Sequence, residues 1–261
     1  MTRRAISGLR VIVTGASSGI GRALAGELSR QGAHLVLSAR REERLSQLAR
    51  ELQGRDVQVV YRAGDITSAE VRAGLVRTAR DALGGLDVLI NNAGVGALGP
   101  FATASEERLR RIMEVNFFAP AELMRGAMEL LRAGRQPMIV NVSSVLGHRA
   151  VPQKSEYCAS KFALHGLSDA VRAELASTGI DLLVVSPSTT QSEFFDNVLE
   201  NQSRGASLTP GPMSAERVAR LTVRAIRRGR HEIILSSSGK LLVWLDRLVP
   251  PLANRLVARF G

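Results

Sequence analysis

The sequence predicts an α/β protein in which helices cover both faces of a doubly wound parallel sheet. Apolar, β-rich runs alternate with helical patterns along the chain, and such crossovers make successive strands parallel. The strand segments are continuous apolar runs, which is typical of strands buried on both faces. A chain of 261 residues with 45% hydrophobic and 23% charged residues suits one large domain, so we expect residues 1–261 to form it.

The same patterns give the order of the elements. Strands are expected at residues 9–14, 35–38, 57–61, 88–91, 138–142, 181–186 and 231–235. Helices are expected at residues 20–30, 42–52, 69–83, 105–132 and 156–177. An apolar run at 241–260 follows the last strand, and Pro250 and Pro251 should divide it into two short helices.

Charge and composition exclude several classes of protein. The formal net charge is +11, but the arginines are scattered along the chain and only 4% of residues are aromatic, so we expect no nucleic-acid partner. The sequence contains no uninterrupted run of about 20 apolar residues, so we expect no membrane-spanning helix. Cys158 is the only cysteine and the first residues form no apolar signal segment, which favours a cytoplasmic protein.

A glycine-rich turn at residues 14–21 joins the first strand to the first helix. Glycines permit a tight turn, and the amides at the start of the helix can bind a pyrophosphate. Any tight turn of this kind can need glycine, but its place after the first strand favours a dinucleotide site. The expected cofactor contacts in this turn are Gly15, Ser17, Ser18, Gly19, Ile20 and Gly21.

The end of the second strand indicates which dinucleotide is bound. Sites that prefer NAD place a carboxylate there, where it accepts a hydrogen bond from the ribose 2′-hydroxyl. This chain has Arg40 and Arg41 instead, and guanidinium groups pair well with a 2′-phosphate. We therefore expect NADP(H) rather than NAD(H), the alternative being that both arginines only begin a solvated helix.

Tyr157 and Lys161 lie one helical turn apart at the start of an expected helix. They share a helix face, so the hydroxyl and the ammonium can address one site. Free tyrosine, with a pKa of about 10, is a weak base at neutral pH, and a nearby ammonium favours the tyrosinate. Alone this spacing is a weak motif, because chance produces it often.

Taken together, the motifs resemble the short-chain dehydrogenase/reductase family in its compact form. The similarity covers residues 9–235 and rests on segments in a fixed order: the turn at 14–21, Asp65-Ile66, residues 91–94, Asn116, Ser143-Ser144, and Tyr157 with Lys161. It implies a Rossmann-like three-layer sandwich around a central parallel sheet of seven strands. It also implies hydride transfer between nicotinamide and a carbonyl or alcohol carbon.

The resemblance implies a role for each matching residue. Tyr157 resembles the general acid/base, and Ser144 the residue that hydrogen-bonds the substrate oxygen. Lys161 resembles the residue that binds the nicotinamide ribose and lowers the tyrosine pKa, and Asn116 the residue that holds a water of the proton relay. On the adenosine side, the expected cofactor contacts are Asp65, Ile66, Asn92, Ala93 and Gly94.

The chain departs from the family pattern after the sixth strand, where Ser188 follows Pro187 in place of glycine. Pro187, Thr190 and Ser192 are expected near the cofactor. Residues 194–212 are expected to form a lid over a moderately apolar substrate, with ordinary packing as an equal alternative. No metal site is predicted.

The partners are less defined by the sequence. The amphipathic extension at residues 240–261 can pack on the domain or on another subunit, which we favour, or lie on a membrane surface through residues 241–260. The resemblance suggests a homodimer or homotetramer built on the helices at 105–132 and 156–177. A protein that senses NADP(H) without catalysis remains the alternative function, because a fold does not fix an activity.

Overall fold

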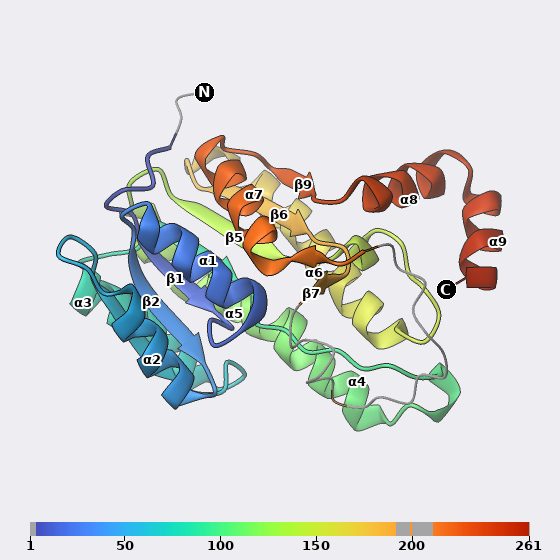
Figure 1. Cartoon of the computed structure of the whole chain (residues 1–261), viewed down its shortest axis with the longest axis horizontal. Coiled ribbons are helices and arrows are strands. Elements are labelled where there is room, and N and C mark those ends of the chain that lie inside the picture. Colours follow the sequence, from blue (N-terminus) through green and yellow to red (C-terminus); the bar gives the residue numbers. More distant parts are fainter. Residues whose placement is uncertain (1–3, 192–198, 200–210, 261) are drawn as a thin grey trace.

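A seven-stranded parallel sheet forms the centre of the computed structural model, which describes residues 4–191, 199 and 211–260 (Figure 1). Its strand order is β3-β2-β1-β4-β5-β6-β9. The strands are β1 (Arg10–Thr14), β2 (His34–Ala39), β3 (Val59–Ala63), β4 (Val88–Asn91), β5 (Met138–Val142), β6 (Asp181–Ser186) and β9 (Glu232–Ile234). The expected doubly wound architecture is confirmed, including the seven parallel strands.

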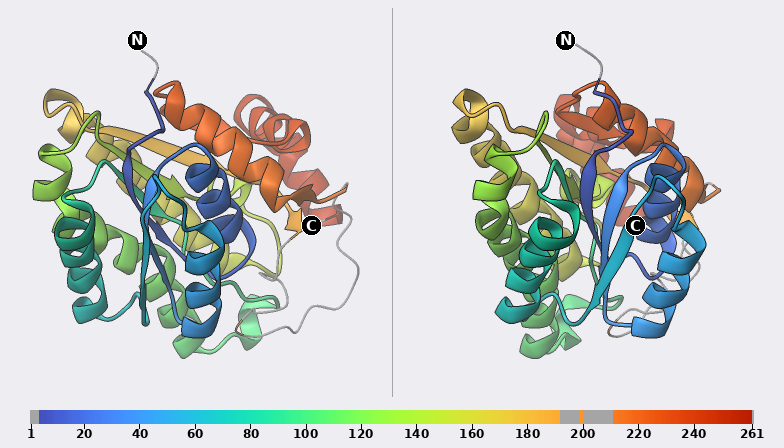
Figure 2. Two further views of the ribbon diagram at one scale, coloured as in Figure 1. Left: turned by 60° about the vertical axis from the view of Figure 1, so that its left-hand side comes forward. Right: turned by 90° about the vertical axis from the view of Figure 1, so that its left-hand side faces the viewer.

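Helices form a layer on each face of this sheet (Figure 2). One layer contains α1 (Gly19–Arg30), α2 (Glu42–Leu52) and α7 (Ala215–Arg227), and the other contains α3 (Ala69–Leu83), α5 (Ala119–Arg132) and α6 (Ser155–Glu174). Side chains of β1 alternate between two buried cores: Val11 and Val13 face the α1 layer, and Ile12 faces the α3 layer. This alternation explains why the strands are apolar throughout.

Three segments differ from what the sequence predicted. The expected helix at 105–132 is divided into α4 (Glu106–Met113), a π-helical segment Glu114–Phe118, and α5. Helix α7 was not predicted, although its buried positions recur with helical spacing. A small two-stranded sheet, β7 (Thr190–Gln191) with β8 (Met213–Ser214), was not predicted either.

The C-terminal extension forms two helices, as the paired prolines predicted. Helix α8 (Ser237–Leu248) ends just before Pro250, where α9 (Pro250–Phe260) begins. Among the described residues, no helix combines the length and apolar character needed to cross a bilayer.

The strands β1 and β4 are neighbours in the middle of the sheet. From β1 the chain adds β2 and β3 toward one side, and from β4 it adds β5, β6 and β9 toward the other, so the order reverses between β1 and β4. In open parallel sheets this point opens a crevice outside the carboxyl ends of the strands, where ligands bind. The expected site residues follow these strand ends. Most of the expected lid at 194–212 lies outside the described residues.

Candidate active site

The turn between β1 and α1 has the backbone that its glycines permit. Gly15 and Gly19 have positive φ angles of 66° and 51°, a region that side chains disfavour. A Cβ atom on Gly21 would lie 2.2 Å from the Gly15 carbonyl oxygen, so no larger residue fits there. Ser18 precedes α1, and its side chain does not cap the helix. The first amides of α1 therefore follow a tight turn and have no side-chain cap, the arrangement that binds phosphate groups.

Thr14 and Asn92 fasten this turn to the end of β4. The Thr14 hydroxyl accepts hydrogen bonds from the backbone amides of Asn92 (2.9 Å) and Ala93 (3.0 Å). The Asn92 side-chain amide donates back to the Thr14 carbonyl oxygen at 2.9 Å. These bonds hold the 92–94 segment against the glycine turn, and the sequence did not assign Thr14 this part.

Arg41 reaches the glycine turn, whereas Arg40 is exposed to solvent. The Arg41 Nη2 atom donates to Ser18 Oγ at 2.9 Å and to Ser17 Oγ at 3.2 Å. The guanidinium is therefore held between the end of β2 and the start of α1. A cation in this place suits an anionic group on the adenosine ribose.

Asp65 is held by neighbours that the sequence did not identify. Its carboxylate accepts hydrogen bonds from the Thr67 amide and hydroxyl and from Arg111 of α4. Burial alone would raise the pKa of Asp65, but these donors and the Arg111 charge lower it to about 2. The carboxylate is thus ionised and able to accept further hydrogen bonds, while the neighbouring Ile66 is buried in the α3-side core.

Asn116 lies in the π-helical segment. Its side chain links three parts of the site. Its Oδ1 accepts from the Val95 amide at 2.9 Å, and its Nδ2 donates to the Val95 carbonyl and to Ser160 Oγ, both at 2.9 Å. π-Helical turns occur often at functional sites. Here the turn brings Asn116 against α6 and the segment that follows β4.

Tyr157 and Ser144 meet at the carboxyl end of β5. Burial raises the pKa of the Tyr157 hydroxyl above its ordinary value, and a hydrogen bond with Ser144 acts in the opposite direction. Ser144 is itself buried and begins a 3-10 turn (Val145–Gly147), where its Oγ accepts from the Leu146 amide at 3.1 Å. Tyr157 is therefore protonated at neutral pH, with its hydroxyl held by Ser144.

The buried Lys161 ammonium lies 5.7 Å from the centre of the Tyr157 ring. It donates to the Val142 carbonyl oxygen at 3.0 Å, and burial lowers its pKa to about 8. A Cβ atom built on Gly94 would lie 3.3 Å from Asn116 Oδ1 and 3.7 Å from Lys161 Nζ. The structure thus brings Ser144, Tyr157, Lys161 and Asn116 together beside Gly94.

A buried ion pair that the sequence did not reveal positions the start of α6. Arg108 of α4 donates from Nε to Glu156 Oε1 at 3.0 Å, and both side chains are almost fully buried. Glu156 immediately precedes Tyr157, so the pair fixes the helix turn that carries the tyrosine. Only the tertiary fold brings these two residues together, because 48 positions separate them along the chain.

The segment after β6 is partly described. The Pro187 carbonyl oxygen accepts from the Val145 amide at 2.9 Å, which joins this segment to the turn after Ser144. Thr190 is buried in β7, and its hydroxyl donates to the Ser188 carbonyl at 3.0 Å. Ser192 lies outside the described residues.

Comparison with known proteins places this geometry in a family. Residues 10–203 match the family model described as short chain dehydrogenase. The chain belongs to the short-chain dehydrogenase family. The resemblance to this family of oxidoreductases is therefore confirmed.

Individual relatives agree with this assignment. "Dehydrogenase/reductase SDR family member 7B" of Mus musculus is 32% identical over 95% of this chain and 80% of its own length. "Ketoacyl reductase HetN" of Nostoc is 29% identical over 98% of this chain and 90% of its own length.

Solved structures resemble the fold closely. A short-chain dehydrogenase/reductase from Burkholderia phymatum in complex with NAD has a TM-score of 0.86 at 25% identity, covering 95% of this chain and 96% of its own. One from Burkholderia cenocepacia in complex with NADP has a TM-score of 0.83 at 26% identity, covering 97% and 99%.

Proposed function

We propose that this protein is an NADP(H)-dependent oxidoreductase that moves a hydride between nicotinamide and a carbonyl or secondary alcohol, with Tyr157 as general acid/base. The observation that carries the proposal is the convergence of Tyr157, Ser144, Lys161 and Asn116 at the carboxyl ends of the strands, where Lys161 and Asn116 approach Gly94. A protein that only senses the dinucleotide needs the turn but not these four side chains.

Tyr157 and Ser144 hold the substrate oxygen. Because burial raises the pKa of Tyr157, its hydroxyl carries a proton at neutral pH and donates it to a carbonyl oxygen in the reductive direction. Ser144 already hydrogen-bonds this hydroxyl, so a substrate oxygen can lie within reach of both groups. Two donors at that oxygen stabilise the negative charge that develops there. The bound nicotinamide supplies or accepts the hydride.

Lys161 and Asn116 serve the proton path. With a pKa of about 8, Lys161 is charged at neutral pH yet releases a proton more readily than an ordinary lysine. Its ammonium lies 5.7 Å from the centre of the Tyr157 ring and next to Gly94, which Asn116 also approaches. It can therefore bind ribose hydroxyls, while Asn116 holds a water that returns the proton. The lowering of the Tyr157 pKa expected from Lys161 is not seen in this structure, where burial raises that pKa.

The preference for NADP(H) rests on Arg41. Its guanidinium lies against Ser17 and Ser18, and residues 37–41 contain no carboxylate that would repel a 2′-phosphate. Arg40 adds a second, exposed cation. The similar solved structures include one with NAD and one with NADP, so the choice comes from this chain's own residues.

Two exposed apolar surfaces bear on assembly. Phe118 and Phe162 are 46% and 43% exposed, on the π-helical segment and on α6. They support the proposal of a homodimer or homotetramer built on these helices, because large apolar side chains at the surface favour association.

The second surface is on α8 and α9. Leu241, Trp244 and Leu248 of α8 are 69%, 56% and 72% exposed, so the described part of the domain does not cover them. Arg247, Arg255 and Arg259 accompany them, which suits a subunit contact or an anionic membrane surface. Co-sedimentation with anionic liposomes, with and without residues 241–261, distinguishes these readings. The proposed location is cytoplasmic, with or without this peripheral contact.

The activity is tested by following NADPH oxidation with ketones, aldehydes, steroids and 3-oxoacyl thioesters, beside direct titration of NADPH binding. We expect turnover with at least one moderately apolar carbonyl. No turnover across the panel, together with tight NADPH binding, would favour the sensor instead.

A further inference from the structure

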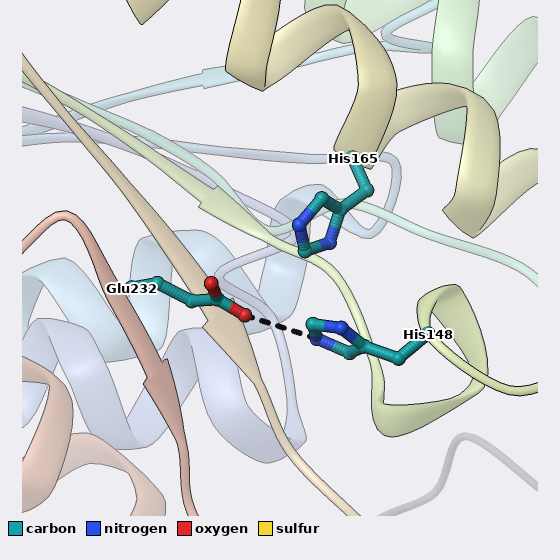
Figure 3. Close-up of side chains that lie close together, drawn as sticks. All are labelled: His148, His165 and Glu232. Carbon is teal, nitrogen blue, oxygen red and sulfur yellow. Dashed lines mark ion pairs between the residues drawn. The ribbon is translucent and has the colours of Figure 1, made fainter. Parts of the chain in front are cut away.

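Two histidines and a glutamate converge next to the proposed active site. His148 follows the 3-10 turn after Ser144, His165 lies on α6, and Glu232 begins β9. Figure 3 shows both imidazole rings and the carboxylate pointing toward one another. One nitrogen or oxygen atom from each residue lies within 4.8 Å of the corresponding atoms of the other two.

Close contacts define the cluster more sharply. His148 Nε2 lies 3.2 Å from Glu232 Oε1 and 3.0 Å from Ser186 Oγ. The two imidazole rings pack edge to face, with their centres 4.4 Å apart. Both rings are largely buried, whereas the Glu232 side chain is partly exposed. The rings are therefore held in place, and the carboxylate has room to adjust.

His165 contributes a polar atom that the surrounding protein leaves unused. Among the described residues its Nδ1 atom is buried and has no hydrogen-bond partner. Its other ring nitrogen, Nε2, lies 3.8 Å from the Asp169 carboxylate, one turn further along α6. A buried imidazole nitrogen without a partner is costly unless a ligand uses it. A carboxylate that accepts a hydrogen bond from the opposite nitrogen is the usual support of a metal-binding histidine. Asp169 is near this position but pairs with Arg172 at 2.7 Å, so a small shift of its carboxylate would bring it within hydrogen-bond distance.

We propose that His148, His165 and Glu232 bind a divalent transition-metal ion, with Zn²⁺ as the best match. Two imidazoles and one carboxylate are a ligand set that Zn²⁺ uses, with a water at the fourth position. Tetrahedral ligands at about 2.0–2.1 Å from the ion lie about 3.4 Å from one another. The separation of His148 Nε2 and Glu232 Oε1, 3.2 Å, is close to that value. All three ligand atoms lie within 4.8 Å of one another, so small movements of the His165 and Glu232 side chains would complete the site.

The surrounding charges are compatible with a cation. Glu232 and Asp169 provide two negative charges, against which lie Arg172, paired with Asp169 at 2.7 Å, and Arg247, near His148. Oxygen and nitrogen donors combined favour Zn²⁺ over Mg²⁺ or Ca²⁺, which prefer oxygen alone. The site could not be predicted from the sequence, because its three residues come from separate elements without a compact motif.

The position assigns the ion a structural part in the enzyme. His165 follows Lys161 by one helical turn, His148 follows Ser144 closely, and Ser186 precedes Pro187. A metal bound here would join α6, the segment after β5 and the edge strand β9. These are the elements that carry the proton-transferring residues and the nicotinamide-side segment, so the ion would position them without touching the substrate.

Cobalt titration tests the site independently of activity. Tag-free, chelator-treated protein is titrated with Co²⁺, and the d–d absorption bands and the number of ions bound are recorded. We expect one ion per chain with the intense bands of a four-coordinate site, displaced by Zn²⁺. Glu232→Gln and His165→Gln should weaken binding by about 100-fold or more, since even a supporting residue is worth about 10- to 100-fold.

His231→Gln is the matched control, because this exposed histidine is the immediate neighbour of Glu232 and lies outside the cluster. It should bind Co²⁺ like the parent protein. Circular dichroism verifies that each variant is folded, and Glu232→Gln, at a partly exposed position, keeps the test available if His165→Gln unfolds. Unaltered Co²⁺ affinity and bands in folded Glu232→Gln, or no binding by the parent protein, would overturn the proposal.

Discussion

Buried charges are paired differently at the two ends of the central sheet, the amino edge where its parallel strands begin and the carboxyl edge where they finish. At the amino edge, Asp87 is fully buried and accepts hydrogen bonds from Arg10 Nη2 at 2.7 Å, from Arg10 Nε at 2.9 Å and from the Arg135 amide at 2.6 Å. Arg4 pairs with Asp181 at 2.9 Å along the same edge. Burial alone would raise the pKa of Asp87, but Arg10 and these hydrogen bonds hold it below its usual value.

At the carboxyl edge, the buried Lys161 has a carbonyl oxygen as its hydrogen-bond acceptor, that of Val142, and its pKa falls because burial is not offset by a carboxylate. The charge at the amino edge is satisfied within the fold and stabilises it. The charge at the carboxyl edge is left for a cofactor and a substrate to use, at a cost in stability. This difference identifies the reactive edge on physical grounds.

Lys161→Met should have the largest effect on activity. Turnover should fall by about 100-fold or more, because the positive charge beside Tyr157 is lost. The free energy of unfolding should rise by up to about 3 kcal/mol at neutral pH, since a pKa lowered from 10.5 to about 8 measures the cost of burying the ammonium. Steady-state kinetics measures the turnover, and urea denaturation measures the free energy of unfolding. A variant less stable than the parent protein would show that the buried Lys161 charge does not cost stability.

Asp87→Asn should have the opposite effect on stability. It leaves Arg10 partly buried without its charge partner, and breaking such a pair lowers the free energy of unfolding by about 3–5 kcal/mol. Turnover of the folded enzyme at low temperature should be almost unchanged. Glu106→Gln, which removes the partner of the exposed Arg110, is the control and should have little effect on the denaturation midpoint.

Arg41→Ala tests the cofactor assignment with a smaller effect. It should raise KM for NADPH by about 10- to 100-fold, the worth of a charge-assisted hydrogen bond, and leave KM for NADH nearly unchanged. Arg50→Ala removes an exposed cation further along α2 and should alter neither value. The proposed preference for NADP(H) would be wrong if the parent enzyme prefers NADH, or if Arg41→Ala raises KM equally for NADPH and NADH.

The smallest effect per step of the experiment is a pH dependence of stability, measured one pH unit at a time. Lys161 binds its proton less tightly in the folded than in the unfolded chain, so between pH of about 8 and 10.5 the unfolded state holds more protons. Stability of the parent protein should therefore rise relative to Lys161→Met by about 1.4 kcal/mol per pH unit in that window. A stability difference that stays constant across it would show that Lys161 titrates as an exposed lysine does.

Most of the fold was predictable because its signals are local. The glycine turn, the apolar strands and the spacing of Tyr157 and Lys161 are each contained in a short stretch of chain, and the structure confirms the sheet they predicted. The break of the helix at 105–132 was missed, because the π-helical segment depends on the contacts of Asn116 with Val95 and Ser160. The contact with Ser160 exists only once α6 has packed.

The parts of the site that the sequence did not reveal are pairs joined by tertiary structure. Arg108 with Glu156, and Arg111 with Asp65, are ion pairs between residues that are far apart along the chain. The cluster of His148, His165 and Glu232 has the same origin. A motif shows which residue does chemistry when the residues are contiguous, but the groups that position it are found only in the folded protein.

The most direct test of the account is hydride transfer in Tyr157→Phe, measured in a single turnover with enzyme in excess and with NADPH binding determined on the same sample. If Tyr157 is the proton donor, the variant should bind NADPH within about twofold of the parent affinity and transfer hydride about 100- to 10,000-fold more slowly, the range of general acid–base catalysis. A rate close to that of the parent enzyme would contradict the assignment of Tyr157 as the proton donor.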